Sequence, residues 1–258
     1  MGYKSLFIFI LLCSLACHNN AGSSARSEIT VTSPGENPFG SIKDIPLPAG
    51  FERTACTENS FAYFLRNTKL KKDKTVYLYN GQPKINQSAQ FAVLNIRVGS
   101  KDLQQCADAV MRLRAEFLFS QKEFDRILFY DNAKTAYKFS PPYTRDHFPA
   151  YLERVFGMCG TASLAKQLNR VESFSQVMPG DVIIRGGFPG HAVMVMDAAI
   201  NKSGQKIYLL AQGYMPAQDI HVLINPASEN LSPWYAVSES RLIETPEYRF
   251  TKEELRRW

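Results

Sequence analysis

A cysteine, a histidine and a glutamine stand where they could form a site for nucleophilic catalysis. Cys106 follows Gln105 early in an amphipathic stretch, His191 follows Gly190 at the mouth of an apolar run, and Gln212 lies near the end of the next apolar run. A thiol can serve as nucleophile, an imidazole as its general base, and a polar partner can orient the ring. These residue types indicate acyl-transfer chemistry.

Three apolar runs must position the histidine and the glutamine. They cover residues 181–184, 192–197 and 207–214, and Gly-, Pro- or Asn-rich turns separate them. Short aliphatic runs between such turn residues predict three antiparallel strands.

The register of the second and third strands can be predicted from their loop. If the loop is centred between residues 201 and 202, Asp197 faces Lys206 and His191 faces Gln212. Directly opposed residues have Cβ atoms about 4.5–5.5 Å apart, which permits an imidazole–amide hydrogen bond. A slip of two residues keeps both side chains on one face, whereas a slip of one separates them.

A long helix is expected to carry the cysteine. Ser100 is a suitable N-cap for a helix that runs to about Phe119, which places Cys106 in its second turn. Cys106 is either a small buried hydrophobe or a thiolate nucleophile near a helix start, and its second-turn position weakens the dipole argument for the latter. Cys159, in a linker before Gly160, is the rival nucleophile. Further helices are predicted at 148–156, 161–168 and 252–258.

The order of these motifs resembles the papain-like bacterial cell-wall hydrolases of the CHAP and NlpC type. The residues that carry the resemblance are Gln105-Cys106, Pro179-Gly180-Asp181 and Gly190-His191, followed by Gln212 on the next strand, and they span roughly residues 100–215. The resemblance implies an α+β fold with a papain-like core, in which the Cys106 helix packs on an antiparallel sheet that contains His191 and Gln212.

The same resemblance implies a role for each residue. Gln105 would stabilise the oxyanion, Cys106 would be the nucleophile, His191 the general base and Gln212 the orienter. In those hydrolases a capped helix commonly lies between the catalytic helix and the Pro-Gly-Asp motif. The predicted helix 161–168 fits that place and favours Cys106 over Cys159. An amide at 212 departs from the commoner acid, His or Asn, and stabilises an imidazolium less than a carboxylate does.

The N-terminus predicts export and lipid attachment. Lys4 precedes an apolar run at residues 6–15 that is too short to span a bilayer permanently, so residues 1–16 are interpreted as a signal peptide. The sequence Ser14-Leu15-Ala16-Cys17 resembles the lipobox of bacterial lipoproteins. That resemblance implies cleavage before Cys17, lipid on its thiol and a membrane partner, and the next two residues imply the outer membrane.

Composition and residue spacing indicate what the remainder of the chain forms and binds. Residues 17–44 are expected to be a flexible tether, and residues 45–258 a single α+β domain with its core at about 91–224. With 45% apolar and 21% charged residues the chain is typical of a globular protein. The net charge of +6 is spread along the sequence, which argues against a nucleic-acid partner. No spacing of cysteines or histidines resembles a zinc site, so we expect no metal and no cofactor.

The stretches 103–117, 186–197 and 209–223 resemble an uncharacterised family of Bacteroidetes lipoproteins, a likeness that supplies no activity.

Three functional hypotheses follow. The first is a lipid-anchored cysteine hydrolase of the cell envelope, periplasmic or surface-facing, which cleaves peptide or amide bonds, with peptidoglycan or an envelope peptide as partner. The second is a lipid-anchored protein on the same scaffold that binds a glycan or peptide without turnover. The third is a structural envelope lipoprotein in which Cys106 is a core residue, and it predicts a large loss of stability for Cys106→Ser.

Overall fold

The computed structural model describes residues 1–2 and 35–258. The predicted signal peptide, the lipid site at Cys17 and most of the predicted tether therefore lie outside the described residues. Within the described part of the chain, no helix is both long and apolar enough to cross a membrane.

A nine-stranded antiparallel sheet forms the centre of the fold. Seven strands follow the order β2-β9-β8-β7-β6-β13-β5, while β1 pairs with β7 and β10 with β8. The strands are β1 (Phe51–Arg53), β2 (Gln90–Val93), β5 (Asn169–Arg170), β6 (Val182–Arg185), β7 (His191–Asn201), β8 (Lys206–Gln212), β9 (His221–Leu223), β10 (Tyr235–Ala236) and β13 (Leu255–Arg257). The three strands predicted from the apolar runs are β6, β7 and β8.

Four α-helices and two separate hairpins complete the described fold, which is α+β. The helices are α1 (Phe61–Arg66), α2 (Cys106–Ser120), α3 (Phe148–Met158) and α4 (Thr161–Gln167), with short 3-10 turns η1 (Ile42–Asp44), η2 (Phe124–Arg126), η3 (Phe174–Gln176) and η4 (Lys252–Glu254). The hairpins are β3 (Leu128–Tyr130) with β4 (Ala136–Lys138), and β11 (Leu242–Glu244) with β12 (Arg249–Thr251).

Helix α2 begins five residues later than the sequence predicts. Ser100 is not its N-cap. That position belongs to Gln105, which has an extended backbone and whose N–H donates to Asp108 Oδ2 at 3.0 Å. An acidic side chain that accepts the N-cap N–H satisfies a group that the first turn leaves free. Cys106 is therefore the first helical residue and not a second-turn residue.

Two further predictions at the chain ends are wrong. Residues 252–258 do not form a terminal helix, because the turn η4 leads into β13, which pairs with β6 and β5 at the sheet edge. The folded part also begins before residue 45. Ile42 is fully buried, and Ser41 and Glu36 form bridges with later segments of the chain.

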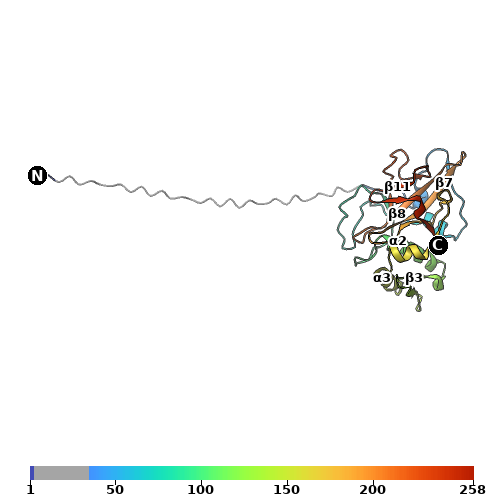
Figure 1. The fold of residues 1–258 in the computed structure, drawn as a ribbon, viewed down its shortest axis with the longest axis horizontal. Helices are drawn as coiled ribbons and strands as arrows, with labels where there is room; N and C mark the ends of the chain where they lie inside the picture. Colours follow the sequence, from blue (N-terminus) through green and yellow to red (C-terminus); the bar gives the residue numbers. More distant parts are fainter. Residues whose placement is uncertain (3–34) are drawn as a thin grey trace. The chain divides into compact units, whose positions relative to one another are not determined.

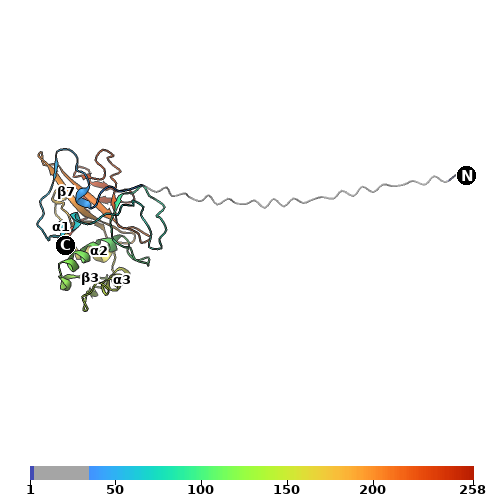
Figure 2. The same cartoon turned by 180° about the vertical axis from the view of Figure 1, so that it is seen from behind.

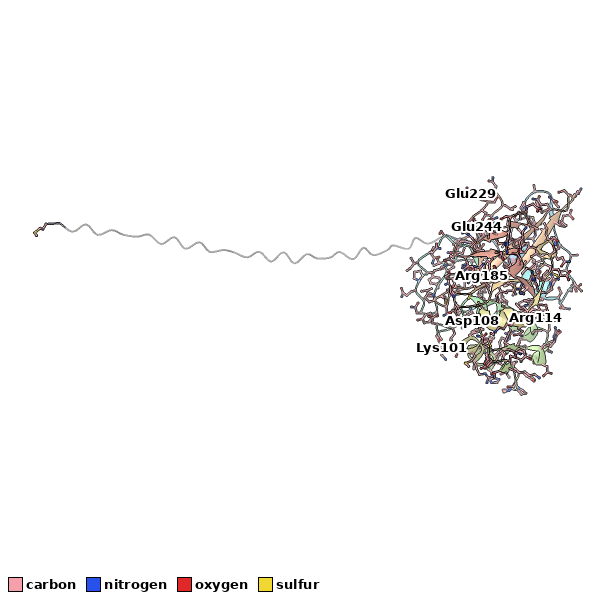
Figure 3. All side chains as sticks on the ribbon, in the orientation of Figure 1. Lys101, Asp108, Arg114, Arg185, Glu229 and Glu244 are labelled. Atoms are coloured by element: carbon pink, nitrogen blue, oxygen red, sulfur yellow. The ribbon has the colours of Figure 1, made fainter. Side chains whose placement is uncertain are left out.

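The sheet separates two apolar layers. On one face, α2 packs against β7 and β8, and Val110 lies in the same core as Ala192 and Met194. On the other face, Phe250 of the β11–β12 hairpin lies in a core with Val193. Figure 1 shows α2 and β11 on different sides of β8, Figure 2 shows α2 beside β7 from behind, and in Figure 3 Asp108 of α2 and Glu244 of β11 mark the two layers. Successive residues of β7 thus face different layers.

The register of β7 with β8 differs from the predicted one because the turn is centred at residue 203 and not between residues 201 and 202. Asp197 pairs with Leu209 and not with Lys206, which lies opposite Ile200. A bulge between Val195 and Asp197 adds one residue to β7. Beyond the bulge Met194 pairs with Ala211, and continuing that pairing places Gln212 two residues out of register with His191. A shift of two preserves the shared face.

The bulge also directs Asp197 toward the helical layer. Its carboxylate is fully buried and pairs with Arg53 Nε of β1 at 2.7 Å and with Arg66 Nη2 of α1 at 2.7 Å. Two arginines around one buried carboxylate connect α1 and β1 to the central strand. Removal of one partner from such a buried ion pair strongly destabilises the fold, because a buried charge is then left unpaired.

We expect Asp197→Asn to lower the free energy of unfolding by about 3 kcal/mol or more, since two arginines lose their buried counter-charge. Urea unfolding monitored by circular dichroism measures the loss. Asp125→Asn is the matched control, because Asp125 pairs with Lys138 while its side chain is 80% exposed, and exposed pairs contribute about 0–1 kcal/mol. Equal losses for the two variants would contradict this view of the β7 bulge.

Candidate active site

The N-terminus of α2 brings Cys106 to the end of the sheet where β7 begins. The backbone N–H groups of Cys106, Ala107 and Ala192 lower the pKa of its thiol, and Ala192 directly follows His191. Gly213, just after β8, lies so close to the helix that a Cβ there would sit 2.8 Å from Gln105 O. The helix start, the first residues of β7 and the exit of β8 therefore meet at one place.

Burial controls the state of the thiol. The side chain of Cys106 is 8% exposed. Loss of solvent raises the pKa of the thiol to about 11, although the surrounding backbone N–H groups act in the opposite direction. An ionised sulfur is disfavoured where water cannot reach it. The thiol is therefore protonated at neutral pH and needs a base to become a nucleophile.

His191 occupies the first position of β7, on the face covered by the β11–β12 hairpin. It is 2% exposed, and its ring centroid lies 4.9 Å from those of Tyr214 and Tyr248 and 5.7 Å from that of Phe250. Burial lowers the pKa of the imidazole to about 4, while the hydrogen bond to Gln212 acts in the opposite direction. The ring is therefore neutral at pH 7 and can accept a proton.

Gln212 holds this ring through a hydrogen bond of 2.8 Å between its Oε1 and His191 Nε2. The amide orientation follows from its other neighbours. Gln212 Nε2 donates to Glu247 Oε2 at 2.8 Å and lies 3.4 Å from His221 Nε2, while the other ring nitrogen of His221 donates to Asp219 O at 2.9 Å. The amide oxygen must then face His191. This network assigns the proton to Nε2 and leaves Nδ1 of His191 with a free lone pair.

Glu247 is a member of this network that no sequence motif indicates. It lies in the turn between β11 and β12, where its Oε2 pairs with Lys84 Nζ at 2.6 Å and its Oε1 accepts from Asn86 at 3.1 Å. Its negative charge raises the pKa of His191, which offsets part of the effect of burial. The amide of Gln212 thus connects the imidazole to a carboxylate 35 residues later in the chain.

Glycine is required immediately before His191. A Cβ at Gly190 would lie 2.7 Å from both Arg185 O and Gly187 O. No larger residue fits between these carbonyl groups without moving the backbone. The close approach explains the Gly-His pair and sets where β7 starts.

The remaining predicted site residues occupy less favourable positions. The side chain of Gln105 donates from Nε2 to Asp102 Oδ1 at 3.1 Å and does not contact the sulfur of Cys106 by a hydrogen bond. Cys159 caps α3 within the apolar core, where burial raises the pKa of its thiol to about 12. Of the two rival cysteines, Cys106 is the one beside the His191 backbone.

No hydrogen bond joins Cys106 and His191 among the described residues, although the N–H of Ala192, the residue after His191, lowers the pKa of the Cys106 thiol. Cys106 approaches from the layer of α2, whereas the imidazole contacts Phe250 of the opposite layer. The residues that the structure describes also contain no cluster of three or more His, Cys, Asp or Glu side chains suited to a metal ion.

Comparison with known proteins places most of the chain in one family match. Residues 42–141 and 130–257 match the family described as Domain of unknown function (4846). Neither a curated protein nor a solved structure matches the chain. The match covers both α2 and the strands that carry His191 and Gln212.

We expect the buried His221 to make stability pH-dependent. Burial lowers its pKa to about 3 in the folded state, from an ordinary value of 6.5. Between pH 6 and pH 4.5 the unfolded chain takes up a proton that the folded chain does not, so this residue destabilises the fold as the pH falls.

His221→Asn should reduce the slope of the unfolding free energy against pH in this window by about 1.4 kcal/mol per pH unit, the value for one proton. Urea titrations of both proteins at several pH values measure the slope. A constant loss at every pH, with an unchanged slope, would contradict a neutral buried imidazole.

Proposed function

The chain belongs to the family described as Domain of unknown function (4846), and from the geometry of its site we propose that it is a cysteine hydrolase of peptide or amide bonds. One observation carries the proposal. Cys106 starts a 15-residue helix whose first turn packs closely against Gly213, the residue after Gln212, while Gln212 holds His191 by Nε2 and leaves Nδ1 free. A nucleophile, a base and an orienter thus share one end of the sheet.

The proposed reaction proceeds by general-base catalysis. The reaction requires His191 Nδ1 to reach Cys106 around the end of the sheet at the first residue of β7. There it removes the Cys106 proton as the sulfur attacks the carbonyl carbon, and the imidazolium then protonates the departing amine. Water, activated by the same imidazole, cleaves the thioester and restores the thiol. Because the thiol and the imidazole are both neutral before the reaction, the proton moves during the attack. No thiolate–imidazolium pair forms before that step.

Backbone donors support the oxyanion in this mechanism. The N–H groups of Cys106 and Ala107 lie at the open N-terminus of α2, where helices favour negative charge. The amide of Gln105, which the sequence assigns to this role, would first have to leave Asp102. We therefore propose that the backbone N–H groups provide most of the stabilisation of the oxyanion and that Gln105 contributes less.

The cellular setting of the proposal comes from the sequence. A lipid on Cys17 would hold the protein at the bacterial outer membrane, facing the periplasm or the surface, and peptides of the cell wall or envelope are then the natural substrates. Helix α2 packs on β7 and β8 of an antiparallel sheet, and the papain-like core is proposed from the motif order in the sequence. We keep that relation as part of the proposal.

A second candidate function is peptide or glycan binding without turnover. It is favoured by the burial of both chemical groups, since Cys106 is 8% and His191 2% exposed and no hydrogen bond joins them in the described structure. In this case the network around Gln212 stabilises the fold only. The same experiment separates the two candidates.

We expect iodoacetamide to alkylate Cys106 faster than Cys56 or Cys159. His191→Gln should slow the alkylation of Cys106 by about a hundredfold, because a general base typically contributes about 10²–10⁴-fold to a rate. Peptide mass spectrometry reads the three thiols separately, so the other two serve as internal controls. Comparable rates at all three, or at Cys106 with and without His191, would favour the binding function. Incubation with cell-wall peptides should release new amino groups with the wild type but not with Cys106→Ala.

Glu247 is proposed as a positioning residue that acts through Gln212. Because its charge raises the pKa of His191, Glu247→Gln should lower that pKa. The acid limb of kcat/KM then moves to lower pH, while the plateau falls because the base is weaker. Glu244→Gln, an exposed change on the same hairpin, is the control and should alter neither. A lower plateau with an unmoved acid limb would assign Glu247 a purely structural role.

A further inference from the structure

A cavity of about 560 Å³ lies between α1, α2 and residues 95–97. Its size falls within the range of about 300–1,000 Å³ that is typical of small-ligand pockets. Neither Cys106, His191 nor Gln212 lines it. Its function is therefore separable from that of the candidate active site.

The cavity offers an apolar surface that is rigid on one side. Phe64 and Ile96 line it together with Tyr63, whose side chain is 38% exposed. Phe64 is supported from behind by Phe117 of α2, with ring centroids 5.8 Å apart. An apolar side chain of a ligand could pack here against Phe64 and Ile96.

Amide side chains lie beside this apolar surface. Asn59, Asn67 and Asn95 all line the cavity. Asn67 donates to Tyr63 O at 2.8 Å, whereas the side chains of Asn59 and Asn95 make no hydrogen bond within residues 35–258. A carboxamide carries one acceptor and two donors, which complement the N–H and C=O of a peptide unit.

The charge of the cavity is positive. Lys69, Arg97 and Arg112 line it, and Glu116 is the one acidic side chain in its wall. Glu116 is already bound to Arg112 at 2.9 Å and to Arg145. Lys69 and Arg97 have no ion-pair partner in the described part of the chain, so the cavity carries excess positive charge. A carboxylate is the complementary group.

We propose that this cavity binds a short peptide with a free C-terminal carboxylate and an apolar last residue. Lys69 and Arg97 receive the carboxylate, the asparagines contact the last peptide unit, and Phe64 with Ile96 takes up the side chain. This inference goes beyond the proposed hydrolysis and does not depend on it, because no residue is shared between the two sites.

The test uses a matched pair of ligands. Isothermal titration compares acetyl-Ala-Ala-Leu with a free carboxylate to the same peptide with a C-terminal carboxamide, on the full chain bearing Cys106→Ala so that hydrolysis cannot consume the ligand. We expect the acid to bind at least about tenfold more tightly than the amide, since hydrogen bonds to a charged group are among the stronger ones. Added salt should weaken binding of the acid.

Variants then locate the site. Arg97→Gln and Lys69→Gln remove exposed charges, so both variants should keep the melting temperature. Each should weaken binding of the peptide acid by about tenfold and leave the weak binding of the peptide amide unchanged. Lys166→Gln, an exposed change on α4, is the control and should have no effect. NMR shifts at the Ile96 methyl group on titration give a second reading that does not require a variant.

Several results would overturn the proposal. These are absence of binding for both peptides, equal affinity for acid and amide, or binding of the acid that neither Arg97→Gln nor Lys69→Gln weakens. Glucuronate, a sugar carboxylate without a peptide unit, is the remaining arm. If it binds as tightly as the peptide acid, the cavity recognises an acidic sugar and the peptide assignment is wrong.

Discussion

The face of the sheet toward which each β7 side chain points is the constraint on which the rest of the fold depends. This strand contacts β1, β6, β8 and α2, and the bulge at Val195 and Asp197 changes which layer each side chain faces. Before the bulge, His191 points into the layer of the β11–β12 hairpin. After it, Asp197 reaches the arginines of α1 and β1. A straight strand could not place both residues where they are paired, because alternate residues face opposite sides.

The polar network around Gln212 is costly to bury and is therefore almost fully paired. His191, Gln212 and His221 are each at most 2% exposed, and unpaired polar groups in such positions are strongly destabilising. The carboxylate of Glu247 and the ammonium of Lys84 complete the network at its edge. Its consequence is chemical as well as structural, since it fixes one tautomer of His191 in a site where burial keeps both the imidazole and the nearby thiol neutral.

Helix α2 has two distinct environments. Its N-terminus carries Cys106 and the backbone N–H groups that lower the pKa of this thiol, while its later turns contribute Arg112 and Glu116 to the cavity beside α1. The proposed reaction and the proposed peptide-carboxylate site thus share a rigid element without sharing a residue. A protein that acts on peptides has a use for both, because hydrolysis of a peptide bond creates a free carboxylate.

The amino-acid sequence by itself determined the local features, namely the strands β6, β7 and β8, the Gly-His pair at the start of β7, and a shared face for His191 and Gln212. Those features depend on apolar periodicity and turn residues within short stretches. Only the tertiary structure decided the start of α2 at Cys106, the bulge in β7, the carboxylate of Glu247 behind Gln212 and the cavity lined by Arg97. Each depends on contacts between segments that are distant in the chain or on the length of a loop, and no local pattern encodes which distant group will complete a buried hydrogen bond.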